Sequence, residues 1–337
     1  MSTTIEDVAR VAGVSRGTVS RVLNGASNVS EAARAAVNEA VEQTGYRLNS
    51  HARALASGRN HAVAVLLTQP SDELFDDPTI HELVKGVSEG FGDSSDALLL
   101  LLAGSEVERR RTAPFLDRRR IDGVVHLTPH MTDPLLDRII AADLPVAVCG
   151  RLSERFLGPN VRTATIDDLT GATAAAQHLL ACGARRVAII TGPEDAPGAE
   201  FRLKGARSGL GAHFDPRLVR HGDYGPTSGA AAMEDLLQHH PDIDAVFCAS
   251  DRMAAGAYRS LEAHGKRIPN DVQVVGFDDH EISRDLMPAL TTIHQPIQHV
   301  GEQAILMLQS MIAGKDPGHR LFPTHLVVRD STLNPAR

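Results

Sequence analysis

The sequence predicts an α/β protein that has two lobes built on parallel β-sheets and a small helical segment in front of them. From His61 onward, short apolar runs alternate with longer amphipathic stretches, a pattern typical of β-α-β units. A polar stretch at 151–163 interrupts the alternation, which then starts again, so we expect two such lobes. Residues 1–47 instead repeat their apolar side chains with the period of α-helices.

The first of three expected helices begins after Thr4, which forms the T-x-x-D pattern of a capping box with Asp7. Gly13 ends this helix, and Ser15 can cap a second one over SRGTVSRVL. The inward face of the first helix consists of Ile5, Val8, Ala9 and Ala12. The second helix turns Val19, Val22 and Leu23 inward and presents Arg16, Gly17, Ser20, Arg21 and Asn24 outward.

A third helix is expected from Ser30 to Gly45. Two helices joined by a short turn that contains glycine are typical of the helix-turn-helix motif. Residues 48–60 have a helical composition, but Leu48 and Leu55 are their large apolar side chains. A segment this short and polar cannot bury itself, so we expect a linker that becomes helical when something holds it.

The remaining elements follow from the alternation. Strands are expected at 62–68, 97–103, 123–127 and 145–150, with helices at 79–91, 106–119 and 133–142 between them. The second series predicts helices at 169–182, 200–213, 227–239 and 252–264, and strands at 186–191, 244–249 and 272–277. A strand-like run at 291–295, a helix at 298–313 and a terminal strand at 321–329 must join one lobe or the other.

Length and composition exclude several classes of protein. The 337 residues are 42% hydrophobic and 23% charged, which is ordinary for a globular chain of two to three domains. The longest apolar run, at 97–104, has the length of a strand and not the roughly 18 residues of a membrane span. Acidic residues and no apolar segment stand near the N-terminus, so we expect no secretory signal, no membrane partner and a cytoplasmic protein.

The net charge of −8 is unevenly distributed. Residues 1–60 hold seven arginines, no lysine and five acidic residues, a net charge of +2 that leaves −10 for the remainder. This asymmetry indicates a small segment that meets an anion, attached to a body that avoids one.

The sequence contains fragments of catalytic and metal-binding motifs, but it lacks the neighbouring residues or elements that these motifs require. Residues 13–17, GVSRG, match the G-x-S-x-G of hydrolases, but that motif requires a strand before the serine, where a helix is expected. His294 and His299 have no cysteine partner at zinc spacing. Cys149, Cys182 and Cys248 form no C-x-x-C pair and are expected to be buried thiols. We therefore expect no catalytic residue, no metal site and no cofactor.

Residues 4–25, TIEDVARVAGVSRGTVSRVLNG, resemble the helix-turn-helix of the lactose-repressor (LacI/GalR) family of bacterial transcription regulators. The resemblance continues through GVVHL, ITGP, AVFCASDRMAAGA, VQVVGFDD and PALTTIHQP, and so covers the whole chain. It implies a DNA-binding headpiece, a hinge helix and a two-lobed sensor similar to periplasmic sugar-binding proteins. The implied boundaries are 1–47 for the headpiece, 48–60 for the hinge, 61–164 with 297–318 for the first lobe, and 165–296 with 319–337 for the second.

In this family the start of the second helix reaches base edges in the major groove, a position that Arg16 and Gly17 hold here. An arginine there can bond both acceptors of a guanine, which is worth roughly 1–3 kcal/mol against a wrong base. The resemblance implies DNA contacts from the headpiece residues Thr4, Ser15, Arg16, Gly17, Thr18, Ser20, Arg21, Asn24, Asn28 and Ser30.

Leu55 matches the leucine that the family wedges into the minor groove at the operator centre. Ala52 and Arg53 are expected to contact DNA beside it. The alternative is a linker leucine that docks on the body of the protein.

The family's ligand lies between the lobes, beyond the carboxyl ends of the strands, where Asp278 falls in this sequence. Asp278 and Arg202 match a ligand-binding aspartate and arginine, and together they suit vicinal hydroxyls. Tyr224 matches a position for an aromatic ring against the effector. Further expected effector contacts are Phe75, Ile166, Ser250, Asp251 and Gln295.

The resemblance therefore implies a homodimeric repressor of carbohydrate genes that binds a palindromic DNA operator and responds to a small molecule. A sugar is favoured as this effector because the chain has no tryptophan and 4% aromatic residues, with a purine as the alternative. Whether the effector releases or promotes DNA binding stays open. A solute-binding protein would share the lobes but lack the first 60 residues, and a sugar-acting enzyme would need a nucleophile or a phosphate loop.

Overall fold

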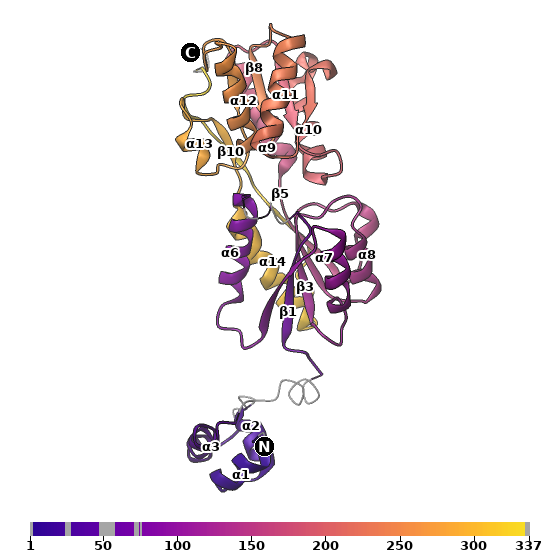
Figure 1. Cartoon of the computed structure of the whole chain (residues 1–337), viewed down its shortest axis with the longest axis vertical. Helices are drawn as coiled ribbons and strands as arrows, with labels where there is room; N and C mark the ends of the chain where they lie inside the picture. Colours follow the sequence, from indigo (N-terminus) through magenta and orange to yellow (C-terminus); the bar gives the residue numbers. More distant parts are fainter. Residues whose placement is uncertain (1–2, 24–27, 47–57, 71–73, 75, 334–337) are drawn as a thin grey trace. The chain divides into compact units, whose positions relative to one another are not determined.

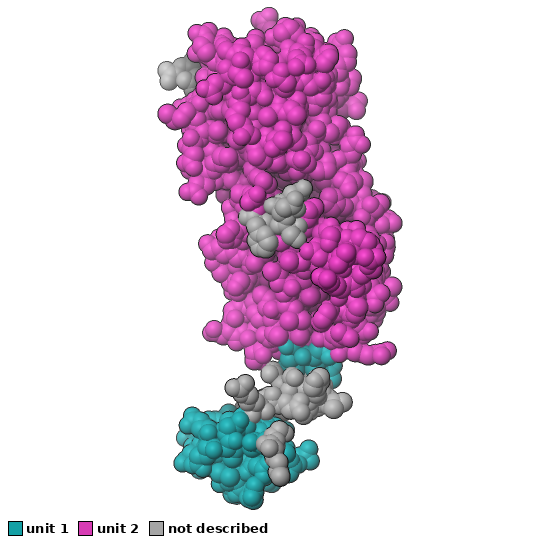
Figure 2. Space-filling view, in the orientation of Figure 1, with its two compact units in different colours: residues 1–61 teal, residues 62–337 magenta. Residues whose placement is uncertain are grey.

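The computed structural model describes residues 3–23, 28–46, 58–70, 74 and 76–333. It divides into two compact units, residues 1–61 and residues 62–337, shown in different colours in Figure 2. Each unit has its own hydrophobic core.

The first unit contains α1 (Ile5–Ala12), α2 (Arg16–Leu23) and α3 (Glu31–Thr44). The expected caps are present: the Thr4 hydroxyl accepts from the Asp7 main-chain N–H, Asp7 accepts in return from that of Thr4, and Gly13 ends α1 with φ of 64°. The Ser15 hydroxyl accepts from the N–H of Thr18 at 3.1 Å. Because a helix precedes Ser15, the hydrolase motif lacks its strand. The core of this unit is Val8, Val19, Val22, Val37 and Ala40.

The first lobe of the second unit is a parallel sheet in the order β11-β5-β4-β3-β1-β2. Its strands are β1 (Ala62–Leu67), β2 (Ala97–Leu102), β3 (Gly123–Leu127), β4 (Val146–Cys149), β5 (Val161–Ile166) and β11 (Arg320–Phe322). Alternate residues of β1 enter different cores, one with α6 (Pro78–Phe91) and α14 (Ile297–Ile312), the other with α8 (Pro134–Ala141). Helix α7 (Glu106–Thr112), η1 (Ala113–Phe115) and η2 (Glu154–Phe156) complete the lobe.

The second lobe has the parallel order β7-β6-β8-β9, formed by β6 (Val187–Thr191), β7 (Val219–His221), β8 (Ala245–Cys248) and β9 (Gln273–Val275). Its helices are α9 (Asp168–Ala181), α10 (Pro197–Leu210), α11 (Pro226–His239), α12 (Asp251–Ala263) and α13 (Ile282–Asp285), with η3 (Gly211–His213) and η4 (Pro216–Leu218). Strand β10 (Thr292–His294) pairs antiparallel with β12 (His325–Val327). Figure 1 shows α14 with the first lobe and α13 and β10 with the second.

Three predictions about these elements are corrected. Strand β5 ends at Ile166, so the predicted boundary after 164 falls inside it. The expected terminal strand at 321–329 is two strands. The first of them, β11, pairs with β5 of the first lobe, so the expected placement of all of 319–337 in the second lobe is wrong for β11. Strand β7 was not predicted. The chain therefore passes between the lobes after β5, between β10 and α14, and between β11 and β12.

The buried thiols are confirmed for Cys149, Cys182 and Cys248. None of the described helices combines the length and the apolar composition that crossing a membrane requires.

Helices α6 and α14 pack with their main chains in close contact. A Cβ atom at Gly86 would meet the carbonyl oxygen of Gln298, and one at Gly301 would meet that of Leu83. Neither neighbour can move without shifting a helix, because both are main-chain atoms. This contact fixes α6, whose first turn borders the cavity described below.

Replacing Gly86 with alanine is expected to lower the free energy of unfolding by about 1–3 kcal/mol, because the added methyl group overpacks the helix contact. Denaturant unfolding measures this change. Gly158→Ala is the matched control, since a Cβ there meets nothing within 4 Å. Equal unfolding midpoints for Gly86→Ala and the parent would show that α6 and α14 accommodate the added methyl group without a loss of unfolding free energy.

Candidate ligand cavity and nucleic-acid interface

A cavity of about 680 Å³ lies between the two lobes of the second unit. It is lined at the carboxyl ends of parallel strands, by Gln69, Thr128 and Arg151 of the first lobe and by Ser250 and Asp278 of the second. Ligands bind at this edge in open α/β sheets because the loops that follow the strands meet there. The volume is within the range of pockets for small molecules.

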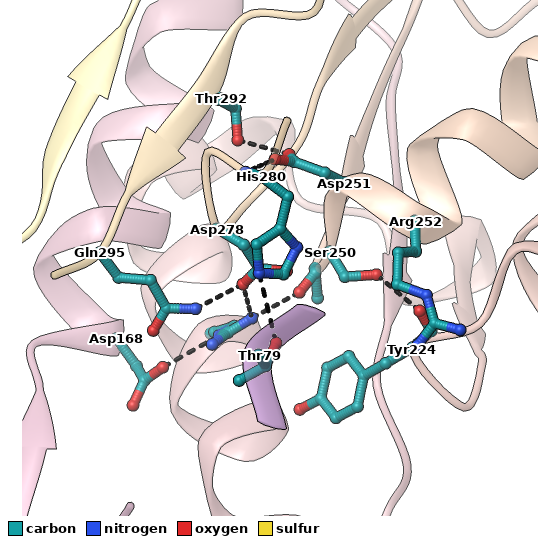
Figure 3. A network of polar contacts seen from close by, with 12 residues as sticks. Thr79, Asp168, Tyr224, Ser250, Asp251, Arg252, Asp278, His280, Thr292 and Gln295 are labelled. Atoms are coloured by element: carbon teal, nitrogen blue, oxygen red, sulfur yellow. Dashed lines mark hydrogen bonds and ion pairs between the residues drawn. The ribbon is translucent and has the colours of Figure 1, made fainter. Parts of the chain in front are cut away.

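Arg202 is the central cation of the cavity. It is 9% exposed, and its Nε donates to Asp168 at 2.9 Å while Nη1 donates to Asp278 at 3.3 Å and to the carbonyl of Ala249 at 2.6 Å. The guanidinium also lies 3.8 Å from the ring centre of Phe277. These contacts hold the guanidinium between the two carboxylates, and all three residues line the cavity. Figure 3 labels Asp168 and Asp278.

Burial shapes the charge of this cluster. It raises the pKa of Asp278, against the attraction of His280 and Arg202, and it raises the pKa of Asp168, against that of Arg202. Burial acts to lower the pKa of Arg202, but Asp168 and Asp278 together raise it above its ordinary value. Two carboxylates therefore share one guanidinium, and the cluster favours a partner that donates hydrogen bonds.

The loop after β9 holds Asp278 in a strained backbone conformation. Asp278 has φ of 117° and Asp279 has φ of 62°, a backbone region that residues other than glycine rarely adopt. The Asp278 N–H donates to the carbonyl of Ile293 at 2.8 Å, and Asp279 pairs with Arg329 and His294. Such strain persists where surrounding contacts enforce it, and it is common at functional sites.

Asp251 does not take the predicted place. It is fully buried and is not among the residues that line the cavity. Its carboxylate accepts from the Thr292 hydroxyl at 2.5 Å and from the main-chain N–H of His280 at 2.9 Å. The prediction of a direct effector contact is therefore corrected: Asp251 supports the loop that carries Asp278.

Tyr224 and Ser250 line the cavity together. The Ser250 hydroxyl caps α12 by accepting from the N–H of Met253 at 3.1 Å, and it donates to the carbonyl of Tyr224 at 3.0 Å. Tyr224 has φ of 68°, and burial raises the pKa of its phenol, which stays protonated. Ser250 thus positions the tyrosine, whose ring centre lies 5.7 Å from the Arg202 guanidinium.

Two further expected residues, Ile166 and Gln295, also line the cavity, and the Gln295 amide donates to Asp278 at 2.6 Å. The sequence did not predict a role for Asp168, which begins α9 directly after β5. The start of β5 itself lies in the stretch 151–163, which was expected to be polar and not a strand. The other lining residues that the sequence did not predict include Gln69, Asp77, Thr79, Thr128, Arg151 and Arg252. The carboxyl ends of the correctly predicted strands at 62–68, 123–127 and 145–150 would have pointed to three of them.

The predicted DNA-contacting residues lie on one small unit. Thr4, Ser15, Arg16 and Gly17 are exposed. Arg16 is the first residue of α2 and pairs with Glu6 at 3.2 Å, with 72% of its side chain exposed. The remaining described residues of this set are exposed at Arg21, Asn28 and Ser30 and half-buried at Thr18 and Ser20. The predicted contacts Asn24, Ala52, Arg53, Leu55 and Phe75 lie outside the described residues.

The described residues contain no group of histidine, cysteine and acidic side chains that could hold a metal ion. The chain thus contains an exposed helix-turn-helix face and, in its other unit, a cavity between two α/β lobes in which charged side chains stand among apolar ones. This combination defines a ligand-responsive, DNA-binding regulator.

Comparison with known proteins agrees with this class. The family described as bacterial regulatory proteins, lacI family, matches residues 4–49, and a periplasmic binding protein-like domain matches residues 176–332. The transcriptional regulator CelR of Thermobifida fusca is 38% identical over 336 residues, which cover 97% of this chain and 98% of the relative. The chain belongs to the lacI family of bacterial regulatory proteins.

Two solved structures extend the comparison. A complex of CelR with cellobiose is 37% identical, with a TM-score of 0.76 over 98% of this chain and 99% of that one. The lac repressor dimer bound to operator and the anti-inducer ONPF is 28% identical, with a TM-score of 0.83 over 99% of this chain and 100% of that one.

Proposed function

We propose that this chain is a transcriptional repressor of carbohydrate genes that binds a palindromic operator as a homodimer and responds to a neutral saccharide. The saccharide occupies the cavity between the lobes, with Arg202 and Asp278 as its principal partners and Tyr224 against a sugar face. The observation that carries the proposal is the buried Arg202, held between Asp168 and Asp278 in that cavity. Asp251 holds the loop that carries Asp278, because it accepts a hydrogen bond from the main-chain N–H of His280.

The charges of the cavity favour a neutral ligand over a phosphorylated one. The carboxylates that line it are Asp76, Asp77, Asp168, Asp223 and Asp278, against Arg151, Arg202 and Arg252. Arg202 already faces two of these carboxylates and Arg252 faces Asp77 at 3.7 Å. Placing a phosphate there would bury further negative charge, whereas hydroxyl groups can donate to the carboxylates.

The aromatic content favours a sugar over a purine. Tyr224 is the one phenylalanine, tyrosine or tryptophan among the described residues that line the cavity. A single ring suits the C–H face of a sugar. The relative CelR has been solved with cellobiose, which makes a disaccharide the first probe for this chain.

The test uses operator DNA selected in vitro from random sequences by the full chain. We expect cellobiose or a related neutral disaccharide to change operator affinity and to raise the melting temperature, while adenosine and glucose 6-phosphate do neither. A ligand at 100 times its Kd stabilises the folded state by about 2.7 kcal/mol. If the protein responds to adenosine and to none of the sugars, its effector is a purine and not a saccharide.

Arg16 is expected to read a base. Arg16→Ala should weaken operator binding about 5- to 150-fold, because a bidentate arginine contact is worth roughly 1–3 kcal/mol, and should relax selectivity at one operator position. Electrophoretic titration of single-base operator variants measures both effects. Arg10→Ala removes another exposed arginine and should leave selectivity unchanged. Retained selectivity in Arg16→Ala would assign the contact to a different residue.

Strand β2 offers an edge for dimerisation. It is the last strand of the first lobe's sheet, and its Leu98 and Leu100 side chains are 36% and 54% exposed. Val107 and Phe115 add 46% and 41% exposed apolar side chains from the segment that follows. We assign this edge to a second copy of the chain, because one headpiece reads too few bases and the related lac repressor is a dimer on its operator.

Leu100→Lys is expected to shift the protein from dimer to monomer in analytical ultracentrifugation and to weaken operator binding by at least tenfold, since each monomer then binds one half-site. Met287→Lys, which changes an 89% exposed side chain of the second lobe, is the control. If the Leu100→Lys protein remains a dimer, the dimer interface does not lie at the edge of β2.

We further propose that the chain has no catalytic activity and works in the cytoplasm on DNA. In the structure, Ser15 of the hydrolase-like motif caps a helix instead of standing on a strand-to-helix turn.

A further inference from the structure

We propose that His280 is a positioning residue that couples the effector carboxylate of Asp278 to helix α6 of the first lobe. The inference rests on the proposed function, because it gives the effector at Asp278 a route to the opposite lobe. Figure 3 shows the His280 ring beside Asp278, with its contact to Thr79 marked.

The loop that carries His280 is held in place by the buried carboxylate of Asp251. The main-chain N–H of His280 donates to Asp251 at 2.9 Å, and Asp251 is itself held by the Thr292 hydroxyl. His280 is 2% exposed. The imidazole is therefore enclosed by the protein, and the loop that carries Asp278 sets its position.

The ring faces one group in each lobe. Its Nδ1 lies 3.7 Å from Oδ2 of Asp278 and has no hydrogen-bond partner among the described residues. Its Nε2 lies 3.4 Å from the hydroxyl of Thr79 in α6. The Oδ1 atom of Asp278 already accepts from Gln295 and Arg202, so Oδ2 is the oxygen that His280 faces. A hydroxyl group that donates to Oδ2 would change the charge that the imidazole experiences.

On the opposite side, the contact reaches the first turn of α6. Asp77 caps this helix by accepting from the N–H of Thr79 at 2.9 Å, and it faces Arg252 of the second lobe at 3.7 Å. Two contacts, Arg252 with Asp77 and His280 with Thr79, thus join the lobes at one helix end. Because α6 is packed against α14 at Gly86 and Gly301, a force on this turn moves the helix pair and not an isolated loop.

A double-mutant cycle in the full chain tests the coupling without any effector. His280→Leu and Thr79→Val each remove one side of the contact, and Thr79→Ser retains the hydroxyl. We expect each of the first two to change operator Kd by at least threefold, the double variant to change it no further, and Thr79→Ser to match the parent. Thr173→Val, which removes a helix-bound hydroxyl outside the cavity, should have no effect.

The second measurement is the ratio of operator Kd with and without saturating cellobiose. This ratio should fall at least fivefold toward unity in His280→Leu and in Thr79→Val, while cellobiose still binds by calorimetry. Changes in operator Kd that multiply in the double variant, or a ratio kept by both variants, would overturn the proposal. If the parent itself ignores cellobiose, the proposed effector fails, and the cycle still decides the role of His280.

Discussion

Arg202→Leu is expected to abolish effector binding and to lower the free energy of unfolding by about 3–5 kcal/mol. The substitution leaves Asp168 and Asp278 buried without their shared cation, which is the costly way to break a buried ion pair. It also removes the donor to the Ala249 carbonyl. Calorimetric titration with cellobiose and denaturant unfolding measure the two effects separately.

A second variant separates recognition from stability. Arg202→Leu combined with Asp168→Asn removes one unpaired charge and should recover part of the stability without recovering effector binding. Operator binding by both variants should persist at temperatures where they are folded, because the DNA-reading face lies in the other unit. Normal effector affinity in either variant would contradict the assignment of Arg202 as a ligand partner.

Deleting residues 1–60 is expected to eliminate operator binding while leaving the affinity for the effector unchanged. The remaining chain keeps both lobes with their cores, so it should fold by itself. It also loses seven arginines and carries a net charge of −10, so it lacks the cations that attract DNA phosphates, and its charge disfavours DNA most at low salt. Fluorescence anisotropy with labelled operator and calorimetry with cellobiose provide the two measurements.

A point variant of the full-length protein tests whether the loss of operator binding comes from the first unit and not from shortening the chain. Val19→Asp places a charge in the core of the first unit and should abolish operator binding in the full-length protein. Operator binding that survives the deletion would show that the lobes themselves contact DNA.

The sequence predicted most where the determinants are local. Thr4 and Asp7 form a capping box, and Gly13 and Gly45 end helices in the left-handed conformation, because each depends on a few neighbouring residues. Strands with continuous apolar runs were also found. Strand β5 was missed because its sequence, VRTATI, mixes threonine and arginine with apolar residues, although Thr163 and Thr165 are buried.

The candidate site was predicted in part. Arg202 and Asp278 come together as the resemblance implies, but Asp168 joins them through the fold from a position 34 residues before Arg202. Asp251 follows a strand end like the lining residues, and nothing local to it indicates that it turns into the core toward Thr292. Burial and long-range pairing decide these roles, and a single sequence records neither.

The three passages of the chain between the lobes bear on how the protein is made. The first lobe needs α14 and β11, which come from residues 297–322, so its sheet and its main core stay incomplete until almost the whole chain has been synthesised. The helical unit at the N-terminus is contiguous and can fold as it leaves the ribosome. On each nascent chain, the part that reads DNA is therefore finished well before the part that regulates it.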